Sequence, residues 1–226
     1  MRRKLKVLFI STIIIISIIG IIVVAEKILE KNNTGIKEII DNIAQKEETT
    51  TEDSFLLSDE VIKNYLTPNE YSRPGKELKK VNAIVVHYVG NPGTTAAQNR
   101  SYFENLKDTH ATSASSHYII GMEGEIIQCV PLNEISYASN NRNKDTIAIE
   151  CCHPDETGQF TTATYKSLVK LVAALCRTYD LDPETGIIRH YDVTGKYCPL
   201  YYVNHEDEWY GFKLDVKAEL AAVNTK

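Results

Sequence analysis

The chain has 226 residues, which leaves room for one ordinary domain with accessory segments and excludes two full-sized domains. Its hydrophobic content of 43% and charged content of 24% are typical of a globular protein and exclude a collagen-like or wholly disordered chain. The formal net charge is −5, and residues 1–25 hold basic residues but no acidic ones, so the rest of the chain is strongly acidic. A basic footprint for phosphate is therefore absent, and we expect no nucleic-acid partner.

The N-terminal segment, residues 1–25, predicts a membrane anchor. Val7 to Ala25 is an uncharged, largely apolar run, and a helix of that length roughly matches the ~30 Å hydrocarbon core of a bilayer. Basic residues precede the run, whereas one acid and one base follow it, so the N-terminus is expected in the cytoplasm. We expect a single-pass protein of the cell membrane with its main domain on the outer side. A cleavable signal peptide ending at Ala25 is the alternative, and it would give a secreted protein.

Residues 26–70 predict a stalk between the anchor and a globular domain. The first part contains isoleucines at helical spacing, but Asn and Gly residues interrupt it. The next part, residues 46–54, reads KEETTTEDS and has too little apolar surface to pack. We therefore expect a solvated linker up to about residue 70.

Residues 71–226 predict one globular domain of the α/β class. Short apolar runs followed by turn residues predict strands near residues 83–89, 116–120, 125–130, 146–151 and 186–190. Gly121 to Gly124 joins the second and third runs and predicts a hairpin. Apolar residues at helical spacing predict a helix from about Thr161 to Tyr179, and a second helix closes the chain at 207–222. Because strands and helices alternate, we expect a sheet with helices packed on it.

The five cysteines do not predict a disulfide framework, because their number is odd. Cys129, Cys151 and Cys176 fall on apolar faces of the predicted elements, where a thiol acts as a small hydrophobic group, and we extend that interpretation to Cys152. Cys198 differs, because it lies in a loop rich in turn residues.

Two histidines and this last cysteine form a candidate metal site. His87 and His190 each end a predicted strand, and Cys198 follows His190 by eight residues. Catalytic zinc sites usually take three protein ligands of these types and leave a position for water. Spacing alone leaves the alternative open that His87 is a strand-end histidine bonded to backbone groups.

Four segments carry a resemblance that goes beyond spacing. They are IVVHYVGNPGT at 84–94, SSHYIIGMEGEIIQCVPLNEISYAS at 115–139, DTIAIECCHPDETGQF at 145–160 and IIRHYDVTGKYCP at 187–199. In these segments, and in their order, the chain resembles the type 2 family of zinc-dependent N-acetylmuramoyl-L-alanine amidases, whose superfamily includes phage T7 lysozyme and the peptidoglycan recognition proteins. It looks most like the endolysin-like amidases of Gram-positive bacteria.

The resemblance implies a central mixed sheet flanked by helices, with one zinc ion in an open groove. The implied zinc ligands are His87, His190 and Cys198, and the implied catalytic residues are Glu150 as the base and Lys196 as a positive charge near the reacting carbonyl. Each catalytic residue has a plainer alternative: Glu150 as an edge acid paired with a surface cation, and Lys196 as a solvated turn residue. A catalytic tyrosine of T7 lysozyme has no counterpart, because Ser116 stands in its place and Tyr118 would point to the other face of its strand.

The function that the resemblance implies is hydrolysis of the amide bond between N-acetylmuramic acid and L-alanine in peptidoglycan. The expected partners are peptidoglycan or muropeptides and the membrane, and the expected state is a monomer. Two alternatives stay open. One is a non-catalytic peptidoglycan receptor on the same fold, although such receptors commonly lose the cysteine ligand. The other is a peptidase with Cys198 as nucleophile, which a proline directly after the cysteine disfavours. The resemblance implies that the segment from Tyr137 to Arg142 lines the substrate groove, and the alternative is an ordinary polar loop.

Overall fold

A central sheet of six strands organises residues 53–223, the part of the chain that the computed structural model describes. The strand order is β1-β4-β3-β5-β2-β6, and among these pairs β3–β4 is antiparallel whereas the others are parallel. The strands are β1 (Val61–Lys63), β2 (Ala83–Tyr88), β3 (Tyr118–Ile120), β4 (Ile126–Gln128), β5 (Thr146–Cys151) and β6 (Ile187–Arg189). The expected mixed α/β sheet is confirmed, including the β3–β4 hairpin.

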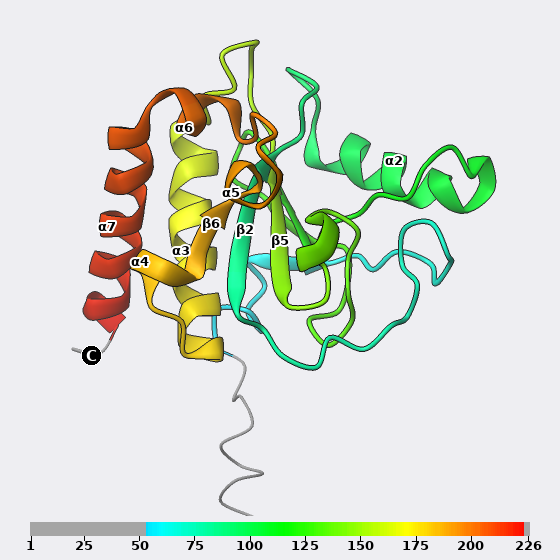
Figure 1. Ribbon diagram of the computed structural model, residues 1–226, viewed down its shortest axis with the longest axis horizontal. Coiled ribbons are helices and arrows are strands. Elements are labelled where there is room, and N and C mark those ends of the chain that lie inside the picture. The colour runs from blue at the N-terminus through cyan, green and yellow to red at the C-terminus, as the bar shows by residue number, and fades with distance from the viewer. Residues whose placement is uncertain (1–52, 224–226) are drawn as a thin grey trace, which may run out of the picture. The chain divides into compact units, whose positions relative to one another are not determined.

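Helices cover both faces of this sheet (Figure 1). On one side lie α3 (Thr162–Tyr179) and α7 (Glu206–Val223), and on the other lies α2 (Ala96–Thr109). The short helices are η1 (Asn140–Arg142), α4 (Pro183–Gly186), α5 (His190–Thr194) and α6 (Leu200–Asn204). Thr161, one of two threonines that could cap α3, is the N-cap, because its hydroxyl accepts a hydrogen bond from the Thr164 N–H. Helices α3 and α7 lie where the sequence predicted helices, whereas α2 was not among the predicted elements.

The central strands are apolar on both faces because both faces are covered. In β2 and β5 nearly every side chain is buried, and such continuous apolar runs are typical of parallel strands between helical layers. One hydrophobic cluster joins the sheet to α3 and α7, and a smaller one joins it to α2. All five cysteines are buried and unpaired, as their apolar surroundings predicted for four of them.

The predicted stalk ends earlier than its sequence suggested. From residue 53 the chain packs on the domain, and Leu56, Val61 and Leu66 are each at most 4% exposed. Strand β1 runs parallel to β4 at the edge of the sheet, with Val61 opposite Ile126. Residues 53–70 therefore belong to the folded domain rather than to a solvated linker, because scattered apolar residues in this polar segment find partners that are distant in sequence.

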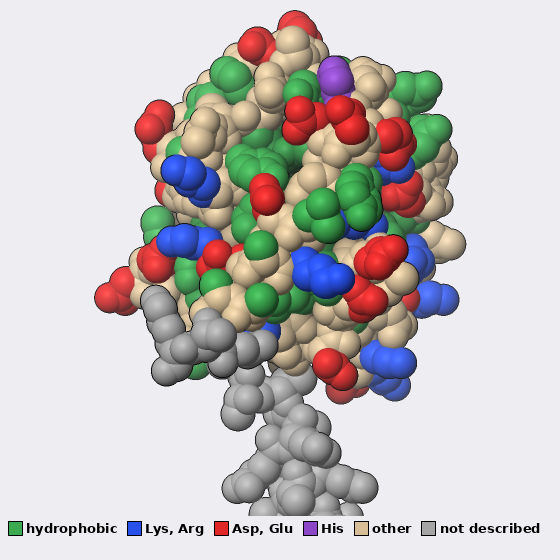
Figure 2. All heavy atoms as spheres, turned by 90° about the vertical axis from the view of Figure 1, so that its left-hand side faces the viewer, with side chains coloured by type: hydrophobic (Ala, Val, Ile, Leu, Met, Phe, Trp, Pro, Cys, Tyr) green, Lys and Arg blue, Asp and Glu red, His purple; other side chains and the backbone are tan. Residues whose placement is uncertain are grey.

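The predicted anchor, residues 1–25, and most of the predicted stalk lie outside the described residues. Among the helices of residues 53–223, none combines the length and apolar character needed to cross a bilayer. Figure 2 shows the face that α7 covers, where charged side chains of both signs are spread among hydrophobic and neutral ones. This face carries no continuous basic patch.

Candidate active site

The predicted site residues lie together at the carboxyl-terminal ends of three neighbouring strands. His87 lies near the end of β2 directly opposite Glu150 on β5, and His190 follows β6, the other neighbour of β2. Because these strands are parallel, their carboxyl ends meet at the same edge, where polar groups commonly converge in such sheets. The two histidines and the acid that the sequence places at strand ends therefore lie together in one cluster.

Cys198 reaches the same cluster from the loop after α5. Gly195 ends this helix with a φ of 77°, and the backbone N–H of Tyr191 donates to the Cys198 carbonyl at 2.9 Å, which closes the loop. The Cys198 Sγ atom then lies 3.8 Å from His87 Nδ1. One nitrogen from each histidine and the cysteine sulfur all lie within 4.8 Å of one another. The structure therefore brings together the three residues that were predicted as metal ligands.

The loop before β5 fixes how the two histidine rings are turned. The Nε2 atom of His87 hydrogen-bonds to the hydroxyl of Ser139 at 3.2 Å, and that of His190 to Oδ1 of Asn140 at 3.1 Å. An amide oxygen only accepts, so His190 carries its proton on Nε2 and keeps the lone pair on Nδ1. If His87 likewise donates from Nε2, its Nδ1 lone pair faces the thiol. Such contacts to the second nitrogen are what orient metal-binding histidines.

This loop is the main feature that sequence reasoning did not resolve. Ser139 and Asn140 fell in a segment that was interpreted only as groove wall or polar loop. Asn140 adopts a φ of 52°, and the side chain of Asn143 accepts the backbone N–H groups of Ala138 and Ser139. Asparagine tolerates positive φ better than most residues, so the asparagine-rich run was the one available signal.

Burial makes both histidines neutral and the cysteine hard to ionise. The pKa of His87 is held well below its usual value by burial, with the charges of His190 and Lys196 acting in the same direction. Burial lowers the pKa of His190 as well. Burial also raises the pKa of the Cys198 thiol to about 12. Neutral imidazoles are the metal-binding form, whereas the thiol needs a neighbouring cation to become a thiolate.

Glu150 lies beside the cluster without a strong partner. Its Oε1 atom is 4.0 Å from His87 Nδ1, and Oε2 is buried with no hydrogen-bond partner in the described structure. Burial raises its pKa to about 8, although the charge of Lys196 opposes that rise. The alternative of an edge acid paired with a surface cation does not fit a carboxylate that is 17% exposed and points at a histidine.

A groove of about 400 Å³ gives solvent access to the cluster. The predicted ligands and Glu150 lie at this groove together with Lys196, an exposed residue of the α5–α6 loop. The remaining wall residues are Tyr88, Val89, Gly90, Phe103, Ala114, Ser115, Tyr137 and Ala138. Tyr137 thus lines the groove, as one of the two interpretations of its segment proposed.

His117, a third histidine of the domain, lies outside the cluster. It is fully buried, and its Nδ1 accepts a hydrogen bond from the backbone N–H of Ala148 at 3.0 Å, while Nε2 bonds to the Glu134 carbonyl at 2.9 Å. Tyr118 is also fully buried, in agreement with its exclusion from a catalytic role. His117 is therefore a structural histidine that joins two loops to β5.

Comparisons with known proteins agree with this geometry. Residues 77–200 match the family described as N-acetylmuramoyl-L-alanine amidase. The chain is 33% identical over 178 residues to N-acetylmuramoyl-L-alanine amidase BlyA of Bacillus subtilis (strain 168), an alignment that covers 70% of this chain and 47% of that protein. It is also 33% identical over 173 residues to the amidase CwlL of Bacillus licheniformis, with 71% and 47% covered. The chain spans about half the length of these curated relatives.

Solved structures share the fold. The catalytic domain of XlyA superposes with a TM-score of 0.59 and 23% identity, covering 69% of this chain and 98% of that one. The catalytic domain of PlyG gives a TM-score of 0.60 at 24% identity, with 71% and 94% covered. A mutant endolysin from Bacillus subtilis gives 0.59 at 25% identity, with 69% and 97% covered. At these identities the likeness supports the fold.

Proposed function

The chain belongs to the N-acetylmuramoyl-L-alanine amidase family, and from that premise we propose that it hydrolyses the amide bond between N-acetylmuramic acid and L-alanine in peptidoglycan. The observation that carries the proposal is the cluster of His87, His190 and Cys198 at the base of an open groove, with Glu150 beside it. Relatives at 33% identity that are named as amidases support it.

We propose that this cluster holds zinc. Zinc would be held by two neutral imidazoles and a thiolate, with the proton of the Cys198 thiol released to solvent on binding, and three protein ligands leave one position for water. Ser139 and Asn140 hold the second nitrogen of each histidine, so that the first remains free for the metal. Zinc, when bound, lowers the pKa of water toward ~7 and polarises a carbonyl group.

Glu150 is placed to act as the general base. Its carboxylate adjoins the cluster, and its second oxygen has no competing hydrogen bond. The positive charge of a bound zinc ion would favour the ionised carboxylate. In that form Glu150 would take a proton from the attacking water and return one to the departing L-alanine nitrogen. Lys196 lines the same groove, where its positive charge favours the negative charge that develops on the amide oxygen.

The geometry disfavours the alternative of a cysteine nucleophile. A catalytic thiol needs a depressed pKa, whereas burial raises the pKa of Cys198 to about 12. The receptor alternative is disfavoured by the presence of a complete ligand set, since receptors on this fold commonly lose the cysteine.

We further propose that the N-terminal segment tethers the domain to the outer side of the cell membrane. Its uncharged run and the basic residues before it support this topology. Tethering would keep an acidic domain close to an anionic wall that does not attract it. The test is membrane fractionation of cells followed by added protease: a membrane-bound, protease-sensitive chain is expected, and a fully released chain would indicate a cleaved signal peptide.

The activity is tested with a chain that starts at residue 53, where packing on the domain begins. Bound zinc is measured first, and new L-alanine amino termini released from peptidoglycan are then counted with and without a chelator. About one zinc per chain and chelator-sensitive release are expected. Zinc binding without release would favour the receptor, and release that ignores the chelator would refute the metal mechanism.

Replacing Glu150 separates the base from the metal site. Glu150→Gln keeps the size and polarity of the side chain but removes its ability to take a proton, so the rate should fall on the order of 10²–10⁴-fold. Bound zinc should stay unchanged. A variant that retains nearly full turnover would show that another group is the base.

A further inference from the structure

Residues 53–76, which we call the strap, pack along the walls of the candidate active site. They precede residues 77–200, the part of the chain that matches the amidase family. After β1 the strap continues beside the end of β4, where the Leu66 N–H donates to the Cys129 carbonyl at 2.8 Å. The strap then reaches α2 and two loops, and each of these three elements carries residues of the groove wall.

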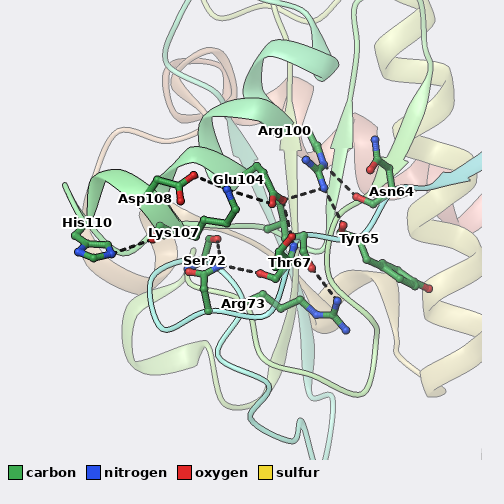
Figure 3. Close-up of polar contacts among 12 residues, drawn as sticks. Asn64, Tyr65, Thr67, Ser72, Arg73, Arg100, Glu104, Lys107, Asp108 and His110 are labelled. Atoms are coloured by element: carbon green, nitrogen blue, oxygen red, sulfur yellow. Dashed lines mark hydrogen bonds and ion pairs between the residues drawn. The ribbon is translucent and has the colours of Figure 1, made fainter.

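The strap holds α2, the helix that contributes Phe103 to the groove wall. Glu104 accepts the Thr67 N–H at 3.2 Å, and Arg100 donates to the Tyr65 carbonyl at 2.8 Å (Figure 3). The strap and this helix also share one hydrophobic cluster on the same face of the sheet. The helix therefore cannot shift without breaking polar and apolar contacts with the strap.

Two loops of the same wall are also held by the strap. In the loop after α2, the Ala114 N–H donates to the Tyr71 carbonyl at 3.0 Å, and Ala114 lines the groove. In the loop after β4, Glu134 forms a bidentate ion pair with Arg73, with nitrogen–oxygen distances of 2.8 and 2.7 Å. This glutamate lies three residues before Tyr137, which lines the groove. The position of the wall therefore depends on contacts between segments that are distant in sequence.

Arg73 makes the strongest of these contacts. Its side chain and that of Glu134 are only 15% and 18% exposed, and bidentate, charge-assisted hydrogen bonds are stronger than those between neutral groups. A third bond, from Nη1 of Arg73 to the Leu66 carbonyl at 2.8 Å, ties the guanidinium back to the strap. Removing the guanidinium would leave the Glu134 carboxylate largely buried without its partner, so the loop that carries it should move.

We propose that Arg73 is a positioning residue that holds the loop after β4 in the place where this loop forms the wall of the substrate groove. The metal cluster is held separately, because the side chain of Asn143 accepts the Ser139 N–H, and Ser139 and Asn140 meet the two histidines. Loss of the Arg73 pair should therefore weaken substrate binding more than zinc binding. The inference rests on the proposed function for the identity of the substrate, peptidoglycan.

The test replaces Arg73 with glutamine in the full-length chain. Arg73→Gln should raise the hydrogen-exchange rate of residues 131–138, measured by mass spectrometry, about tenfold or more, because the loss of a charge-assisted pair makes local opening easier. The KM for peptidoglycan should rise about five- to tenfold, whereas kcat should stay within about twofold and bound zinc should stay unchanged. Arg73→Lys, which keeps the charge but not the bidentate geometry, should give intermediate values.

The matched control is Arg177→Gln, which removes an ion pair of the same kind at the other end of the strap. Arg177 pairs with Asp53 at 2.6 Å, and their side chains are 21% and 13% exposed. Because Arg177 belongs to α3, on the face of the sheet opposite α2, this variant should leave the exchange of residues 131–138 and the KM unchanged.

Faster loop exchange and a higher KM in Arg73→Gln, but not in the control, support the positioning role. Unchanged loop exchange in Arg73→Gln, equal changes in both variants, faster exchange without a rise in KM, or a fall in kcat alone would overturn it. If Arg73→Gln fails to fold, as judged by circular dichroism, Glu134→Gln removes the same pair from the loop and is compared with the control by the same measurements. If the wild-type chain releases no L-alanine amino termini, loop exchange alone decides the positioning role, and the amidase proposal fails by itself.

Discussion

The buried His117 should make the domain lose stability as the pH falls from 7 to 5. Burial lowers its pKa to about 4, against an ordinary value of 6.5, because the ring is fully enclosed. The unfolded chain therefore binds a proton at this histidine more tightly than the folded state does. The free energy of unfolding falls as the pH drops below the pKa of His117 in the unfolded chain.

The two pKa values set the size of this effect. At pH 7 the unfolded chain carries little charge on this histidine, whereas at pH 5 it is almost fully protonated while the folded ring is still mostly neutral. The free energy of unfolding then falls by about 2 kcal/mol between pH 7 and pH 5, and by about 3 kcal/mol between pH 7 and pH 4.

The assay is urea unfolding of zinc-saturated protein, residues 53–226, at pH 7 and pH 5, with His117→Gln as the comparison. Glutamine has a hydrogen-bond acceptor and a donor but does not titrate. The free energy of unfolding of the variant should therefore fall by about 2 kcal/mol less than that of the wild type between pH 7 and pH 5. Effects of all other titrating groups are shared by both proteins and cancel. Equal losses in the two proteins, or NMR ring signals of His117 that titrate near pH 6.5, would refute the reasoning.

Two further predictions concern the metal loop and the hairpin turn. Ser139→Ala removes the hydroxyl that meets His87 Nε2 and should weaken zinc binding about 10- to 100-fold, measured by competition with a chromogenic chelator; an unchanged affinity would mean that this bond does not orient the ring. Gly124→Ala should lower the free energy of unfolding in urea by about 1–3 kcal/mol, because Gly124 has a φ of 87° and an added Cβ would lie 2.8 Å from Ser167 Oγ and 3.0 Å from the Ala163 carbonyl oxygen. A loss below about 0.5 kcal/mol would contradict this reasoning.

The sequence predicted those parts of the fold in which a local pattern decides the structure. The spacing of apolar residues predicted α3, and the glycine-rich turn predicted the β3–β4 hairpin. His87 and His190 were placed at strand ends, and parallel pairing then brought them together.

Other features depend on contacts between distant segments, which no local pattern displays. Strand β1 has three residues and no alternation, so its pairing with β4 could not be predicted from its own composition. Ser139 and Asn140 contact the histidines only because the loop before β5 folds over the ends of two strands. Likewise, the enclosure of His117 requires the loop after β4 to fold over its ring, since Glu134 and Ser136 of that loop both contact it.

The five buried, unpaired thiols make the native domain resistant to alkylation and oxidation. Each is at most 2% exposed, and burial raises the pKa of Cys129, Cys152 and Cys176 to about 12, so reactive thiolate is scarce at these three sites. Cys198, the proposed zinc ligand, is the exception. The placement of the five thiols in sheet, helix and loop means that a single global opening exposes all of them, whereas a local fluctuation exposes few. The mass distribution after brief treatment with iodoacetamide would thus record, molecule by molecule, whether the domain opens as one cooperative unit or in parts.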